Sequence, residues 1–218
     1  AIGNPPWERV KLQEAEWFAA RRPDIAMAPN ASARKKLIAS LIDEEPQLHA
    51  AFRDAVRASE GESAFLRNST RFPLCGRGDI NSYAVFAETF YTISHRVSGC
   101  GLVVPSGILA DDTTKLFFKE IQQSRALAQA IDFENNETLF PGVGHGRMRF
   151  CLLTLRKGHA VDTARLFFLA RGVADLTDRE RWFNLGASDA ATINPHSATC
   201  PVFLRRRDAE LTRAAYLR

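Results

Sequence analysis

Long apolar runs are missing from this sequence of 218 residues, and so is an N-terminal signal segment. No stretch is long enough to cross a membrane as a helix. Cysteines are few, and the four stand far apart, without a C-x-x-C pair or a histidine at zinc-site spacing. We therefore expect no metal site, no membrane contact and a reducing, cytoplasmic setting, with Cys100 and Cys151 as buried thiols.

Internal repeats and low-complexity segments are also absent, and the mixture of charges argues against a disordered chain. With 45% hydrophobic residues, the chain can bury a core in one domain, or in one domain with an appendage. The net charge of +4 and the pI near 9.0 permit nucleic acid as a partner without requiring it.

The hydrophobic pattern changes along the chain. Helical spacing dominates the first part, with helices that begin at Asn30 and Pro46. Further on, we expect apolar strands over 99–105, 127–133, 149–155 and 165–169, a helix over 79–88 capped by Asp79, and a polar helix over 178–182. This alternation predicts an α/β fold with a mostly parallel sheet, helices on both faces and a helical insertion at about 24–70.

Ligands of such sheets bind at the carboxyl ends of the strands. Three stretches fall there in this sequence, namely 4–7, 105–107 and 135–136. We expect them to lie at the same edge of the sheet.

Asn4-Pro5-Pro6-Trp7 is the most distinctive of these stretches. The prolines have fixed φ and no N–H, so this is a stiff, extended turn with free carbonyl acceptors. The Asn4 amide oxygen and the Pro5 carbonyl could accept both hydrogens of an exocyclic amine while Trp7 stacks on its ring. Two such bonds pull the amine toward tetrahedral geometry and free its lone pair to attack an electrophilic carbon. The alternative is a proline turn with a structural tryptophan.

The tetrapeptide resembles the (Asn/Asp)-Pro-Pro-(aromatic) catalytic motif of amino-methyltransferases that use S-adenosylmethionine. Further stretches resemble N6-adenine DNA methyltransferases in the same order, namely 78–86, 102–105, 139–141, 193–195 and 206–211. The resemblance implies that Asn4, Pro5, Pro6 and Trp7 are catalytic and that Trp7 and Phe140 stack on a flipped base. It also assigns Phe86 and Pro6 to the cofactor. Phe86 could equally be plain core, and Phe140 could simply close a loop.

The family's glycine-rich cofactor motif precedes its catalytic turn, whereas nothing precedes the turn here. Three glycine pairs occur elsewhere, at 76–78, 99–101 and 142–144, and none follows a strand and opens a helix. We therefore expect a fragment of a longer protein that, alone, binds S-adenosylmethionine poorly and does not turn over.

The resemblance implies the second half of a Rossmann-like methyltransferase domain, from a restriction-modification or phage-defence enzyme that methylates adenine N6 in double-stranded DNA. Residues 1–172 would be catalytic, and 173–218 would lead toward a target-recognition domain. Two alternatives stay open: a methyltransferase for protein glutamine or RNA, and a non-catalytic DNA-binding or assembly module.

Overall fold

The computed structural model describes residues 1–94, 99–135, 139–141, 148–156, 158, 161–195 and 199–216. The chain forms two compact units. The first contains Ala1–Glu8 and the chain from Ser82 onward, and the second contains Arg9–Asn81. Asn136 and the glycine pair at 142–144 lie outside the described residues.

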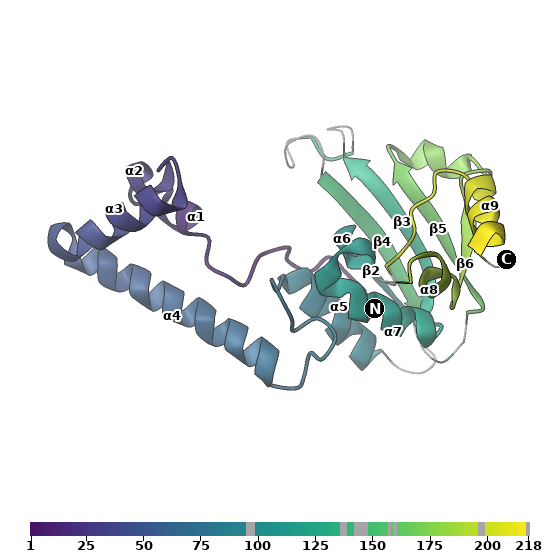
Figure 1. Ribbon diagram of the computed structural model, residues 1–218, viewed down its shortest axis with the longest axis horizontal. Coiled ribbons are helices and arrows are strands. Elements are labelled where there is room, and N and C mark those ends of the chain that lie inside the picture. Colours follow the sequence, from purple (N-terminus) through teal and green to yellow (C-terminus); the bar gives the residue numbers. More distant parts are fainter. Residues whose placement is uncertain are drawn as a thin grey trace. The chain divides into compact units, whose positions relative to one another are not determined.

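The first unit holds a six-stranded sheet in the order β1-β2-β4-β3-β5-β6 (Figure 1). Its strands are β1 (Ile2–Gly3), β2 (Gly99–Pro105), β3 (Leu127–Asn135), β4 (Met148–Arg156), β5 (Thr163–Ala170) and β6 (Phe183–Gly186). Its helices are α5 (Ser82–Ile93), α6 (Gly107–Ala110), α7 (Lys115–Gln123), α8 (Asp189–Ile193) and α9 (Arg206–Tyr216). Two short 3-10 turns occupy Asp112–Thr114 and Val173–Thr177.

The α/β class is confirmed. Strands β1, β2, β3 and β5 run in one direction, and β4 and β6 run against them. Because β4 is inserted between β2 and β3, the sheet is mixed, with parallel pairing only for β1–β2 and β3–β5. The carboxyl ends of β1, β2 and β3 still meet at one edge, beside the start of β4.

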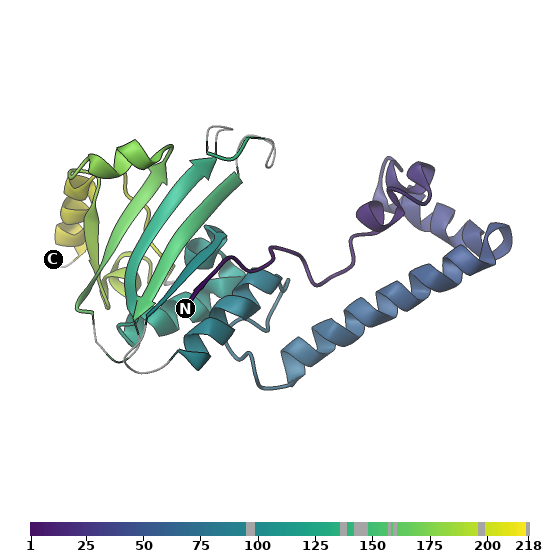
Figure 2. The ribbon, with the colours of Figure 1, turned by 180° about the vertical axis from the view of Figure 1, so that it is seen from behind.

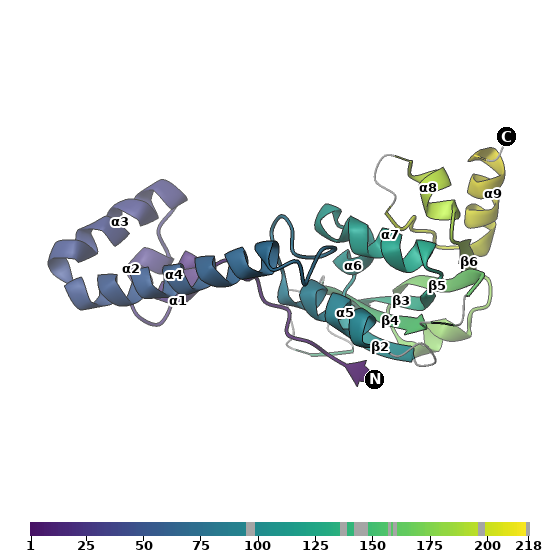
Figure 3. The ribbon, with the colours of Figure 1, turned by 90° about the horizontal axis from the view of Figure 1, so that it is seen from below.

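Helices α5, α6 and α7 gather on one face of the sheet (Figure 3). The fully buried Phe117, Phe118 and Ile121 of α7 form part of the core on this side. No described helix crosses β3 and β4 on the opposite face, which Figure 2 shows from behind. Aromatic side chains cover part of that second face, and the candidate site lies among them.

A buried carboxylate ties four strands or strand ends together. Asp132 of β3 is 0% exposed. Its oxygens accept hydrogen bonds from the Arg149 guanidinium at 2.6 and 3.3 Å, from the Leu169 N–H at 2.9 Å and from the Ser106 hydroxyl. Leu169 has a positive φ of 56° and lies where the β3–β5 register shifts. The carboxylate thereby stabilises an irregular part of the sheet.

The second unit is helical and has its own core. It contains α1 (Glu14–Phe18), α2 (Pro23–Ala26), α3 (Ala31–Glu44) and α4 (Pro46–Asn68). The buried side chains are Phe18, Ile25, Ile38, Leu41 and Phe52. Asn30 caps α3, because its side chain accepts a hydrogen bond from the Ala33 N–H at 2.9 Å. The expected helix starts at Asn30 and Pro46 are therefore confirmed.

One expected helix starts later than predicted, and another is absent. The helix expected over 79–88 is present from Ser82, but Asp79 does not cap it, because Ile80 accepts from the Val10 N–H at 3.1 Å and Asn81 forms a bridge with Arg9. Residues 178–182 are not helical; a 3-10 turn ends before them, and β6 begins directly after Trp182.

The four cysteines are buried, which confirms the prediction for Cys100 and Cys151. Burial raises the pKa of Cys151 and Cys200, and the nearby Asp132 carboxylate raises both further. Among the described helices, none combines the length and the apolar character that a membrane span requires.

We expect Arg149→Met to lower the free energy of unfolding by roughly 3–5 kcal/mol, because it leaves the Asp132 carboxylate buried without its counter-ion. Chemical denaturation measures the change. Arg125→Met is the matched control, since it breaks an exposed ion pair with Asp162, and it should cost at most about 1 kcal/mol. Equal effects of the two variants would show that the buried pair does not support the sheet.

Candidate nucleobase-binding site

The candidate site begins where β1 ends. Gly3 closes the strand, and a Cβ at this position would lie 2.9 Å from Cζ of Phe90 on α5. The chain therefore approaches α5 more closely than a larger residue allows. Asn4 follows with an exposed side chain, Pro5 is buried and Pro6 is exposed.

Ser82, the first residue of α5, holds the turn in place. Its hydroxyl donates to the Pro6 carbonyl at 2.7 Å and accepts from the Glu8 N–H at 3.0 Å. Its own N–H donates to the Glu8 carbonyl at 2.9 Å. These bonds occupy the Pro6 carbonyl. Within the part of the chain that the structure describes, the Pro5 carbonyl and the Asn4 side chain have no hydrogen-bond partner.

Trp7 lies partly buried against the sheet. Its indole N–H donates to the Val103 carbonyl of β2 at 3.3 Å. The ring packs against a cluster on the face opposite α7, made of Phe133, Phe150, Phe167, Ala170 and Trp182. With its polar atom bonded and one side supported, the ring is held as a fixed platform.

Phe140 is placed by a side chain from the end of β3. Asn135, 1% exposed, donates from Nδ2 to the Phe140 carbonyl at 3.1 Å and accepts the Phe140 N–H on Oδ1 at 3.0 Å. This amide pairing fixes the Phe140 backbone in both directions. The Phe140 ring meets Phe150 edge-on, with centroids 5.6 Å apart, and remains 52% exposed.

These side chains enclose a cavity of about 370 Å³. Asn4, Pro5 and Trp7 line it from the turn, and Val103 from β2. Asn135, Phe140, Met148 and Phe150 complete the lining. The volume falls at the small end of the roughly 300–1,000 Å³ typical of ligand sites.

The chemistry of this cavity is narrow. Among the residues that the structure describes, those that line the cavity are uncharged. Aromatic rings line it, and two of its lining residues, Asn4 and Pro5, carry an amide oxygen and a carbonyl that can accept hydrogen bonds. Such a site can hold and orient a flat, amine-bearing ring.

The structure brings Asn4, Pro5, Trp7 and Phe140 to the same cavity. Pro6 does not line it, and its carbonyl bonds to Ser82. Phe86 does not line it either; it lies on α5 with 43% of its surface exposed. Residues of the 4–7 stretch and Asn135 lie at the same edge of the sheet, as expected. Ser106, from the third expected stretch, does not line the cavity, and its hydroxyl donates to the Asp132 carboxylate.

Sequence reasoning missed the roles of Ser82, Asn135 and Phe150. Ser82 follows the turn at long range, and no local pattern indicates its bonds. One feature of the sequence could have indicated the role of Asn135. It is a polar residue at the end of an apolar strand, five positions before the predicted stacking ring of Phe140, and such a residue can bond to the backbone of that ring. Phe150 is a strand aromatic like its neighbours, and only the pairing of β4 with β3 places it here.

Comparisons with known proteins give structural similarities only. No model of a protein family and no curated protein matches the chain. The chain is similar to solved restriction-modification proteins. A type I restriction-modification methyltransferase subunit from Streptococcus thermophilus aligns with 14% identity and a TM-score of 0.43, over 63% of this chain and 33% of that one.

Two other solved proteins align over smaller shares of their own length. The type IIG restriction endonuclease BpuSI has 17% identity and a TM-score of 0.37, over 53% of this chain and 13% of that one. The DrdV–DNA complex has 10% identity and a TM-score of 0.41, over 85% of this chain and 17% of that one. This chain thus spans a third or less of these proteins. Because each TM-score is below 0.5, we base the function on the geometry of the site.

We expect Ser82→Ala to speed hydrogen exchange at the Glu8 amide, because the variant removes the acceptor that protects it. The free energy of unfolding should fall by roughly 1–3 kcal/mol, since two hydrogen bonds are lost. Exchange measured by NMR tests this. Ser40→Ala, which removes a hydroxyl bond to the Leu37 carbonyl in the second unit, should leave Glu8 exchange unchanged. Unchanged exchange in Ser82→Ala would contradict the proposed hold on the turn.

Proposed function

We propose that this chain supplies the base-binding part of a DNA methyltransferase that transfers a methyl group from S-adenosylmethionine to adenine N6. We place it in a restriction-modification or phage-defence system, acting on double-stranded DNA in the cytoplasm. One observation carries the proposal: a single cavity joins the Asn4 amide and Pro5 with the rings of Trp7 and Phe140. Adenine N6 is out of reach inside a duplex, so the base has to be flipped out first.

The residues would act by positioning. Trp7 and Phe140 would cover the two faces of the flipped base, and such stacking is worth roughly 1–3 kcal/mol per base. The Asn4 amide oxygen and the Pro5 carbonyl would accept the two N6 hydrogens. The Pro6 carbonyl is already bonded to Ser82, so it does not compete for the amine.

S-adenosylmethionine, when bound, supplies an electrophilic methyl carbon. The two acceptors on N6 localise its lone pair and aim it, which is catalysis by orientation and electrostatics. An amine held in this way would need no base before attack. The proton that N6 sheds afterwards passes to solvent.

Part of the cofactor has a suitable surface on this chain. The exposed ring of Phe86 and the exposed Pro6 offer flat, uncharged surfaces for a purine ring. No described glycine pair adds a turn for the rest of the cofactor: Gly99 and Gly101 lie inside β2, and Gly76 and Gly78 belong to the second unit. We propose that residues 1–218 alone hold S-adenosylmethionine weakly.

We also propose a division of labour along the chain. Residues 1–172 would contribute to catalysis, and the insertion at about 24–70 falls within the helical Arg9–Asn81 unit. Residues 173–218 would lead toward a target-recognition domain, and their first strand, β6, extends the sheet by pairing with β5.

We expect Asn4→Ala in the full-length gene product to lower the rate of adenine methylation by roughly 10²–10³-fold, because one of the two acceptors on N6 is lost. Asn4→Asp is the matched control, since it keeps an acceptor oxygen at the same place and should retain most of the activity. Methyl transfer to genomic DNA, followed with a methylation-sensitive nuclease, provides the readout.

Full activity of Asn4→Ala, with a normal unfolding profile, would remove Asn4 from the mechanism. Methylation of RNA or of a protein glutamine with untouched genomic DNA would favour the alternative substrates instead.

We expect isothermal calorimetry with S-adenosylmethionine and residues 1–218 to show no tight, stoichiometric binding, because few described residues fit the cofactor. Phe86→Ala should further reduce any residual heat of cofactor binding. Phe65→Ala, which removes a half-exposed ring from the second unit, should leave that heat unchanged. Tight binding of one cofactor per chain would contradict this part of the proposal.

A further inference from the structure

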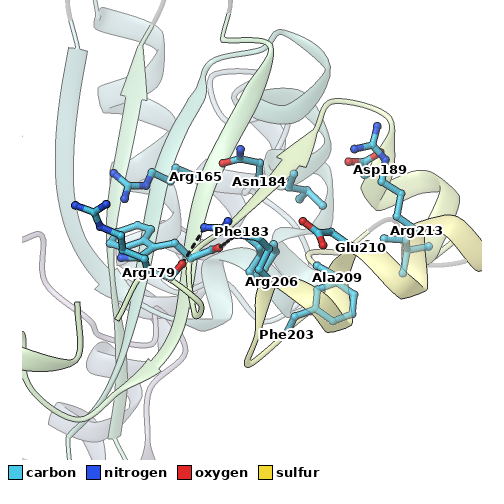
Figure 4. A pocket seen from close by; sticks show the side chains of 13 residues that line it. Arg165, Arg179, Phe183, Asn184, Asp189, Phe203, Arg206, Ala209, Glu210 and Arg213 are labelled. Carbon is cyan, nitrogen blue, oxygen red and sulfur yellow. Dashed lines mark hydrogen bonds and ion pairs between the residues drawn. The ribbon is translucent and has the colours of Figure 1, made fainter. Parts of the chain in front are cut away.

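A second cavity, of about 650 Å³, lies between β6 and α9 (Figure 4). Four arginines line it, together with two carboxylates. The arginines are Arg165 of β5, Arg179 of the loop before β6, and Arg206 and Arg213 of α9; the carboxylates are Asp189 and Glu210. We call this cavity the arginine cleft.

The charges in the arginine cleft do not cancel. Arg213 forms an ion pair with Asp189 at 3.3 Å. Arg206 donates instead to the neutral carbonyls of Arg179 at 2.9 Å and Trp182 at 3.3 Å, so its positive charge remains. Three arginines therefore face the single carboxylate of Glu210, and the cleft attracts anions.

Two of these guanidinium groups are free for a ligand. Arg165 lies over the Trp182 ring, 4.1 Å from its centroid, and no carboxylate pairs with it in the described ranges. The Arg179 side chain likewise has no bonded partner among the residues that the structure places. Figure 4 shows both side chains at the same end of the cleft. Stacking on the indole orients the Arg165 fork, which matches phosphate geometry.

The arginine cleft continues the face that carries the base cavity. Trp182, which lines the cleft, contacts Phe167 with ring centroids 5.2 Å apart. Both belong to the aromatic cluster against which Trp7 packs. The base cavity and Arg165, which lies over Trp182, therefore border the same aromatic cluster.

From these observations we infer that the arginine cleft binds the phosphodiester backbone of duplex DNA, with Arg165 and Arg179 as the contacting residues. This inference deepens the proposed function and rests on it for the choice of DNA over other anions. The site contributes affinity independent of sequence, because phosphate contacts position a duplex without reading its bases.

The test measures binding of a short fluorescent DNA duplex of random sequence as a function of salt concentration. We expect Arg165→Gln and Arg179→Gln each to weaken binding roughly tenfold at low salt and to reduce the slope of log K against log salt by about one. Glu210→Gln should tighten binding, because it removes the unpaired negative charge. Arg207→Gln is the charge-matched control, since Arg207 lies on α9 outside the cleft lining, and its slope should stay near that of the wild type.

Arg165→Gln also removes the contact with Trp182, so thermal unfolding accompanies each variant, and Arg179→Gln carries the test if Arg165→Gln is unstable. The inference is overturned if both folded variants bind the duplex like the wild type, if Arg207→Gln changes the slope as much as they do, or if the wild type shows no salt-dependent binding. Inorganic phosphate that displaces the duplex at equal phosphate concentration would show a site for free phosphate and would also overturn it.

Phe140→Ala separates this site from the base cavity, because it should leave the salt slope of random-sequence binding unchanged. If methylation is never detected but the arginine variants weaken DNA binding, the proposed function fails and the arginine cleft stands. If the gene product methylates DNA while both arginine variants bind the duplex normally, the proposed function stands and the inference about the arginine cleft fails.

Discussion

The hydroxyl of Ser82 is the contact on which the candidate site depends. It joins the start of α5 to a turn that no secondary structure holds, by donating to the Pro6 carbonyl and accepting from the Glu8 N–H. Prolines alone make the turn stiff, but they do not aim it. Asn4 and Pro5, which precede the bonded Pro6, line the cavity. A single side chain thus fixes the turn from which these two residues reach the cavity.

The second half of the site is fixed in a similar way. Asn135 uses both ends of its amide to hold the backbone of Phe140, while Phe150 touches the ring edge-on. The turn at 4–7 and the Phe140 segment are therefore both held in place by hydrogen bonds from other residues, and the side chains that would meet a ligand remain partly exposed. The residues that support the site thus differ from those that would contact a ligand, as expected of a pre-formed site. The arginine cleft follows the same plan, because Trp182 supports Arg165 without neutralising it.

The sequence predicted the strands well because each one is a short apolar run between turns. The range 99–105 is identical in the structure, and the other three expected strands lie inside observed ones. Strand β6 was missed, although Phe183 and Leu185 alternate with Asn184 at strand spacing, because the charged residues before it favoured a helix. The helix expected over 79–88 is present, but it begins at Ser82 because Asn81 pairs with Arg9, and a local cap signal cannot reveal a partner so distant in the chain.

The site itself was only half accessible to sequence reasoning. Asn4, Pro5 and Trp7 could be predicted from the tetrapeptide alone, and Phe140 was assigned by resemblance to the N6-adenine DNA methyltransferases. Ser82, Asn135 and Phe150 act through bonds and contacts that exist only after the sheet forms. The most direct test of the central claim is photo-crosslinking of a DNA duplex with 5-iodouracil at the methylated position to the full-length gene product, followed by mapping of the attached peptide. We predict attachment at Trp7 or Phe140; attachment only within the Arg9–Asn81 unit would contradict the account.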